Sequence, residues 1–182
     1  MAMLLGALSD EELRAQLLVC CASERWVDAM LASDTRPFAS AAALHEAAAS
    51  AWAGAGREDR LQAFAAHPRI GEQSLREKFG DGQHAKWASG EQAGAAGASA
   101  ETIGALAANN DAYFARFGYV FLVCATGKTA EQMLELLLQR LPNDDAVEID
   151  VAAAEQAKIT DIRLDKLLAQ LEADEQAGAA PS

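Results

Sequence analysis

Apolar residues recur every three or four positions along most of the chain, which is the spacing that places side chains on one face of a helix. Ser9, with Glu12 three residues later, has the form of a capping box and predicts a first helix that runs to about Cys21. Ser23 is a suitable cap for a short second helix. The same pattern predicts further helices over residues 40–53, 58–66, 100–117, 130–140 and 145–172.

One run, Tyr119–Ala125, has the composition of a strand and not of a helix. The chain offers no second run of this kind to pair with it, so we predict a buried extended connection that belongs to no sheet. A turn and the helix 130–140 follow. That helix is expected to direct one set of apolar residues inward, namely Met133, Leu134, Leu137 and Leu138.

The predicted architecture is all-α: a single-domain helical bundle of about seven to nine helices with one extended segment. The domain is expected to span residues 1–173, and a disordered tail is expected over 174–182. Residues 71–97 contain many glycines and few large apolar groups, so we expect loops and short helical turns there. Loops of this kind commonly carry functional residues on a rigid scaffold.

The net charge of −12 limits the possible partners. Phosphate binding needs clustered Lys and Arg, which this chain lacks, so no nucleic-acid surface is expected. No apolar run approaches the length of a membrane span, and the N-terminus lacks the features of a signal peptide. Cys20, Cys21 and Cys124 form no CxxC pair, which fits reduced thiols. We therefore expect a cytoplasmic protein without membrane or nucleic-acid partners.

His67 is the first candidate for chemistry. Pro68 disfavours the α region for the residue before it, so His67 should lie where the helix 58–66 ends, with its ring exposed at that end. A neutral imidazole can donate and accept a hydrogen bond, and it exchanges a proton near neutral pH. The alternative, which the residues alone leave open, is a histidine that only caps the carbonyls of the preceding helix.

Two common kinds of site are not expected. His45, His67 and His84 lie on separate segments, without an HExxH motif or paired cysteines, so no metal site is predicted. Gly127-Lys128-Thr129 ends like a phosphate-binding loop, but the upstream glycine and the strand–loop–helix context of a parallel sheet are missing, so no nucleotide site is expected.

The remaining polar candidates are Glu91, Gln92 and Arg163. A carboxylate can orient an imidazole, an amide can bind a carbonyl or an N–H, and a guanidinium can bind a carboxylate through two parallel bonds. Together they would suit a small, anionic, amide-rich substrate and a proton transfer. From the residues alone, the favoured interpretation of Glu91-Gln92 is a solvated helix start, and that of Arg163 is a surface ion pair with Asp161 or Glu155.

The candidate residues belong to a series of short motifs that occur in a fixed order along the chain. The motifs are His67-Pro68-Arg69-Ile70-Gly71-Glu72, Glu91-Gln92-Ala93, Asn110-x-x-Tyr113-x-x-Arg116-Phe117-Gly118-Tyr119-x-Phe121, Arg140-Leu141-x-Asn143 and Lys158-Ile159-x-x-x-Arg163-Leu164. With Trp26 and Arg36-Pro37-Phe38 upstream, they cover nearly the whole chain. They closely resemble the family of 2-oxo-4-hydroxy-4-carboxy-5-ureidoimidazoline (OHCU) decarboxylases.

The resemblance implies an all-α homodimer that needs no metal or organic cofactor. Enzymes of this family convert OHCU to (S)-allantoin with loss of CO2, after urate oxidation and hydrolysis of 5-hydroxyisourate. By this resemblance His67 is the catalytic histidine, Glu91 assists it, and Arg163 faces the substrate. The other implied substrate-binding positions are Pro68, Ala88, Ser89, Gln92, Phe121, Leu122, Val123, Cys124 and Ala125.

The extended segment acquires a role through this resemblance, because its backbone would line the pocket. Its free N–H and C=O groups are expected to satisfy the ureido and ring amides of the substrate. One position departs from the family pattern: many members carry a serine three residues before the glutamate, where this chain has Ala88. Either Ser89 supplies the hydroxyl from a shifted turn, or one substrate hydrogen bond is lost.

Two other classes of function stay open. The chain could be a family member that has lost catalysis and acts as a ligand-binding or scaffold protein, which would show binding without turnover. It could also be a helical interaction protein without a pocket. That class would need an exposed apolar stripe and gives no reason for His67-Pro68 and Glu91-Gln92 to occur together.

Overall fold

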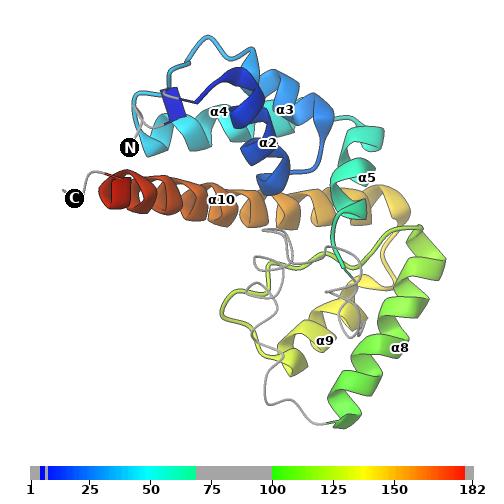
Figure 1. The fold of residues 1–182 in the computed structure, drawn as a ribbon. Helices are drawn as coiled ribbons and strands as arrows, with labels where there is room; N and C mark the ends of the chain where they lie inside the picture. Colours follow the sequence, from blue (N-terminus) through cyan, green and yellow to red (C-terminus); the bar gives the residue numbers. More distant parts are fainter. Residues whose placement is uncertain (1–4, 7, 69–99, 179–182) are drawn as a thin grey trace. The chain divides into compact units, whose positions relative to one another are not determined.

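The computed structural model describes residues 5–6, 8–68 and 100–178. These residues form seven helices and no strand, which confirms the all-α prediction (Figure 1). The helices are α2 (Asp10–Cys20), α3 (Glu24–Leu31), α4 (Ala41–Ala53), α5 (Arg57–Ala65), α8 (Ala100–Phe117), α9 (Ala130–Arg140) and α10 (Asp145–Gly178).

The chain divides into two compact units, which are described separately. The first unit consists of Met1–Gln62 and Ala157–Ser182, and the second consists of Ala63–Gln156. The boundaries fall inside α5 and α10, so each of these helices contributes residues to both units. The expected single domain over residues 1–173 stays a prediction.

Side-chain caps explain where the helices begin. Ser9 accepts a hydrogen bond from the Glu12 N–H, and the Glu12 carboxylate accepts one from the Ser9 N–H at 2.8 Å, which confirms the predicted capping box. Thr129 and Gln132 form a second capping box at the start of α9. Gly118 ends α8 with φ +79°, in the left-handed region that glycine adopts without a steric penalty.

In the first unit, α3 packs against both α2 and α4. Trp26 of α3 is almost completely buried and donates its indole N–H to the Ala48 carbonyl of α4 at 3.0 Å, so the polar atom of this large side chain is satisfied. The buried apolar side chains around it include Leu13, Leu17, Val27, Met30, Phe38 and Leu44.

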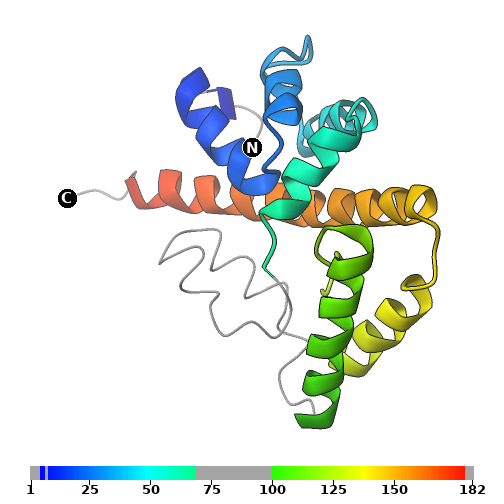
Figure 2. The same cartoon turned by 90° about the vertical axis from the view of Figure 1, so that its right-hand side faces the viewer.

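In the second unit, α8 and α9 pack against each other, as both views show (Figures 1 and 2). The chain between them contains Tyr119–Ala125, in which every residue is buried and no residue is helical or in a strand. The predicted buried connection outside any sheet is confirmed. Tyr113 of α8 contacts it edge-on, with its ring centroid 5.3 Å from that of Phe121.

Two predicted details differ from the structure. Leu138 is 50% exposed, so the prediction that it faces inward is wrong. The buried face of α9 consists of Ala130, Met133, Leu137 and Arg140. The last residue of this face, Arg140, is therefore charged. At the other end of the chain, α10 continues through Gly178, so part of the predicted tail is helical. Alanine, glutamate and glutamine are good helix formers, and Pro181 is the first strong breaker.

His45 of α4 joins its helix to α10 within the first unit. Its Nδ1 lies 3.0 Å from Asp161 Oδ1, and its Nε2 lies 2.8 Å from Asp165 Oδ1. Partial burial opposes the charged ring, but the hydrogen bonds and charges of Asp161 and Asp165 outweigh it and raise the pKa of His45. The protonated ring can donate to both carboxylates at once.

We expect the His45 bridge to make stability depend on pH. Because the folded pKa is raised, the contribution is complete below the unfolded pKa of about 6.5 and is lost as pH rises through the folded pKa. His45→Ala should therefore lower the free energy of unfolding by up to about 1 kcal/mol more at pH 5.5 than at pH 9. Urea unfolding at both pH values measures this difference. Glu46→Ala, on the exposed side of α4, is the control and should show none. An equal cost of His45→Ala at both pH values would contradict the bridge.

Candidate functional site

His67 lies directly after α5, in a turn that Pro68 prevents from continuing as helix. The N–H groups of Ala66 and His67 donate to the carbonyls of Ala63 and Phe64 at 3.3 and 3.1 Å, which tightens this last turn. The ring is only 8% exposed, so the predicted exposed imidazole is wrong. The sequence showed that the helix ends here but not that α10 places a side chain against the ring.

Gln156 of α10 contacts this ring. His67 Nε2 and Gln156 Oε1 are 2.8 Å apart, and Gln156 is completely buried. Because an amide oxygen only accepts, His67 Nε2 carries the hydrogen in this arrangement. Gln156 thus selects one tautomer of the imidazole. Sequence reasoning did not single out Gln156, although a polar residue in the apolar line of a long helix could have drawn attention to it.

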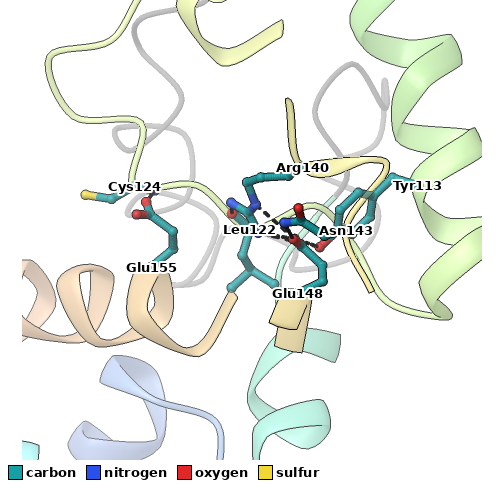
Figure 3. A network of polar contacts seen from close by, with 7 residues as sticks. All are labelled: Tyr113, Leu122, Cys124, Arg140, Asn143, Glu148 and Glu155. Carbon is teal, nitrogen blue, oxygen red and sulfur yellow. Dashed lines mark hydrogen bonds and ion pairs between the residues drawn. The ribbon is translucent and has the colours of Figure 1, made fainter. Parts of the chain in front are cut away.

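The extended segment Phe121–Ala125 is held by three side chains, of which Figure 3 shows Arg140 and Glu155. Arg140 Nη1 donates to the Leu122 carbonyl at 2.6 Å, and the Cys124 N–H donates to Glu155 Oε2 at 2.7 Å. Lys128 Nζ donates to the Cys124 carbonyl at 2.7 Å. The expectation that the backbone groups of this segment are free is therefore wrong for Leu122 and Cys124, which already have protein partners.

Arg140 belongs to a buried polar cluster, whose centre is the carboxylate of Glu148 (Figure 3). Arg140 Nε and Nη2 donate to Glu148 Oε1 at 2.9 and 2.6 Å, the Tyr113 hydroxyl donates to the same oxygen, and Asn143 Nδ2 donates to Oε2 at 2.7 Å. Glu148 has no exposed surface, yet both its oxygens are hydrogen-bonded and its charge is paired. Complete satisfaction is what allows a charge to remain at such a depth.

Tyr113 stays a hydrogen-bond donor in this cluster. Burial, followed by the hydrogen bond to Glu148, raises the pKa of the Tyr113 hydroxyl well above its usual value. The Arg140 guanidinium also lies over the Phe121 ring, 4.6 Å from the ring centroid. The resemblance had singled out Tyr113, Arg140 and Asn143 as motif residues but had given them no role, and Glu148 was missed.

Consecutive residues of α10 connect the segment and the histidine. Glu155 holds the Cys124 N–H, and Gln156, the next residue, holds the His67 ring. These residues belong to the second unit, so the structure brings His67 and the extended segment to the same turn of one helix. Pro68, the residue that follows His67, is also buried.

Arg163 belongs to the first unit. It is only 3% exposed, so the alternative of a surface ion pair is wrong. Its Nη1 lies 3.5 Å from the Val19 carbonyl and 3.4 Å from the Cys20 carbonyl, near the end of α2. Its role towards a substrate stays a prediction. The remaining predicted positions, Ala88, Ser89, Glu91 and Gln92, lie outside the described residues.

Within the part of the chain that the structure describes, no group of three or more His, Cys, Asp or Glu side chains is placed to hold a metal ion. No described helix is long and apolar enough to cross a membrane.

Comparison with known proteins adds independent support for the family. The sequence model described as OHCU decarboxylase matches residues 6–165. The chain is 31% identical over 139 residues to the 2-oxo-4-hydroxy-4-carboxy-5-ureidoimidazoline decarboxylase of Haloferax volcanii, covering 76% of this chain and 79% of that protein. A crystal structure of OHCU decarboxylase in the presence of (S)-allantoin superposes with a TM-score of 0.71 at 32% identity, covering 89% of this chain and 99% of the other.

A longer relative also matches. The chain is 37% identical over 153 residues to the uric acid degradation bifunctional protein TTL of Arabidopsis thaliana. That match covers 82% of this chain but 45% of the relative, so the chain spans less than half the length of the plant protein.

The buried ion pair predicts an unusual pattern of stabilities. Glu148→Ala should lower the free energy of unfolding by about 3–5 kcal/mol, because it leaves the Arg140 charge buried without a partner. The double variant with methionine at positions 140 and 148 should cost less than Glu148→Ala, because it removes both charges. Urea unfolding measures each cost. Asp28→Ala, which removes an exposed partner of Arg14, is the control and should cost about 1 kcal/mol or less. A double variant whose loss of unfolding free energy equals or exceeds that of Glu148→Ala would contradict this account.

Proposed function

The chain belongs to the OHCU decarboxylase family, and from this premise we propose that it decarboxylates OHCU to (S)-allantoin in urate breakdown. The observation that carries the proposal is the buried contact between His67 and Gln156, within a chain that matches the family over residues 6–165. A histidine held in one tautomer at the end of a helix suits a proton transfer at a fixed position.

The reaction needs one bond to break and one proton to arrive. Loss of CO2 breaks a carbon–carbon bond and leaves its electron pair in the adjacent unsaturated ring of the substrate. A proton must then reach one face of the ring carbon that carries the ureido group, while the ring hydroxyl becomes a carbonyl. Delivery to a single face sets the S configuration of the product.

His67 is our candidate for the proton shuttle. Because Gln156 Oε1 accepts from Nε2, that nitrogen keeps its hydrogen and the ring is held in one orientation. An amide partner fixes the ring without adding a negative charge beside it. The ring can therefore accept a proton and release it again within one catalytic cycle.

The other residues of the proposed site follow the family pattern. Glu91 would assist His67, and Gln92 would bind the ring or ureido amides. Arg163 would hold the substrate carboxylate, which its guanidinium can bind through two parallel hydrogen bonds. Homodimerisation, a cytoplasmic location and the use of Ser89 in place of a serine at position 88 remain proposals of the same kind.

Replacing His67 tests the proposed catalysis. His67→Ala should lower kcat by roughly 10²–10⁴-fold, because it removes a general acid–base group. The measurement is the circular dichroism of allantoin formed from OHCU that is generated in situ from urate. The variant should leave only the slow, racemic background reaction.

His45→Ala is the matched control for this experiment. His45 contacts Asp161 and Asp165 and has no place in the proposed site, so this variant should keep the wild-type rate and stereochemistry. Wild-type turnover by a folded His67→Ala variant would remove His67 from the mechanism. A wild-type rate no faster than the blank would remove the proposed reaction.

Gln156 is predicted to act on kcat and not on substrate binding. Gln156→Met removes the acceptor at nearly constant volume and should lower kcat about ten- to hundredfold, since a hydrogen bond to a group that becomes charged contributes roughly 1.5–3 kcal/mol. KM should change little. Gln156→Glu keeps an acceptor oxygen and should retain more activity than Gln156→Met. A wild-type kcat for Gln156→Met would exclude the positioning role.

A further inference from the structure

The extended segment Phe121–Ala125 is ordered without a sheet, and its hydrogen bonds follow a regular alternation. The backbone groups that side chains hold belong to Leu122 and Cys124, two residues apart. Among the described residues, no hydrogen bond reaches the backbone of Phe121 or Val123. In an extended chain the N–H and C=O of successive residues point to opposite edges. The protein therefore holds one edge of this segment.

Three side chains anchor this edge: Lys128 holds the Cys124 carbonyl, and the other two anchors differ in kind. The Leu122 carbonyl accepts from Arg140, whose position is fixed by two hydrogen bonds to the buried Glu148. The Cys124 N–H donates to the carboxylate of Glu155, a charge-assisted hydrogen bond of 2.7 Å. Arg140 is buried in the core of the second unit, whereas Glu155 is only partly buried. Glu155 can therefore be replaced at a smaller cost to the fold.

We propose that Glu155 is a positioning residue for substrate binding: by holding the Cys124 N–H, it directs the opposite backbone edge, that of Phe121 and Val123, towards the substrate. This inference rests on the proposed function, in which the backbone of the segment binds the ureido and ring amides. An unpaired chain would otherwise sample many orientations, and each binding event would have to order it again. Glu155 fixes the segment before the substrate arrives.

A positioning role for Glu155 predicts that its replacement affects KM and not kcat. The ureido amides do not react, so contacts to them stabilise the bound substrate and the transition state equally. Losing such contacts raises KM and leaves kcat nearly unchanged. Glu155→Ala should therefore raise KM at least about tenfold, with kcat within about twofold of wild type. Glu155→Gln keeps an oxygen for the Cys124 N–H and should recover most of this loss.

Glu172→Ala is the matched control, because it removes a partly buried glutamate from the same helix with no recorded contact to the segment. It should leave both constants unchanged. The experiment measures steady-state kinetics on OHCU, together with the affinity for (S)-allantoin by calorimetry and the melting temperature. Weaker allantoin binding by Glu155→Ala at an unchanged melting temperature is the expected result.

The outcomes separate this inference from the proposed function. Wild-type turnover together with an unchanged KM in Glu155→Ala would overturn the positioning role and leave the function standing. A loss confined to kcat, with a lowered melting temperature that Glu155→Gln does not restore, would show a structural role and would also overturn it. A wild-type protein that neither turns over OHCU nor binds allantoin would remove the function and this inference together.

Discussion

The second unit depends on the compensation of one buried charge. Glu148 has no contact with solvent, so burying its charge is costly unless the carboxylate is paired and fully hydrogen-bonded. Tyr113 of α8, Arg140 of α9 and Asn143 in the turn that follows α9 supply these hydrogen bonds. The cost of burying both charges sets a geometric condition: the three donors must all be in place before the core of this unit is stable. The cluster therefore specifies how α8, α9 and the start of α10 come together.

The same condition explains how an extended chain can persist in an all-helical protein. A strand normally satisfies its backbone groups through a neighbouring strand, and the described residues contain none. Arg140 has donors to spare after binding Glu148, and it directs one of them to the Leu122 carbonyl. Glu155 and Lys128 complete the edge at Cys124. Charged side chains thus replace a partner strand on one edge of this segment.

Local chemistry determined which features could be predicted from the sequence. Ser9, Ser23, Ser40 and Thr129 begin helices through hydrogen bonds within three residues, so the helix starts could be predicted accurately. The burial of Glu148 could not, because its partners are distant in sequence and a glutamate on a helix normally faces solvent. His67 shows the same limit. Pro68 marks the end of α5, but the burial of the ring depends on a residue of α10. The family motifs identified His67 and the segment but assigned no role to the residues that hold them.

The choice of an amide to hold His67 has a chemical consequence. A carboxylate at this position would orient the ring equally well, but its negative charge would also stabilise the protonated imidazole and oppose release of the proton. Gln156 is neutral, so it orients the ring without placing a negative charge beside Nε2. Glu155, the preceding residue, is charged and holds a backbone N–H, which does not exchange its proton in catalysis. Two adjacent residues of α10 therefore hold different groups: the carboxylate of Glu155 holds the Cys124 N–H, and the amide of Gln156 holds the His67 ring.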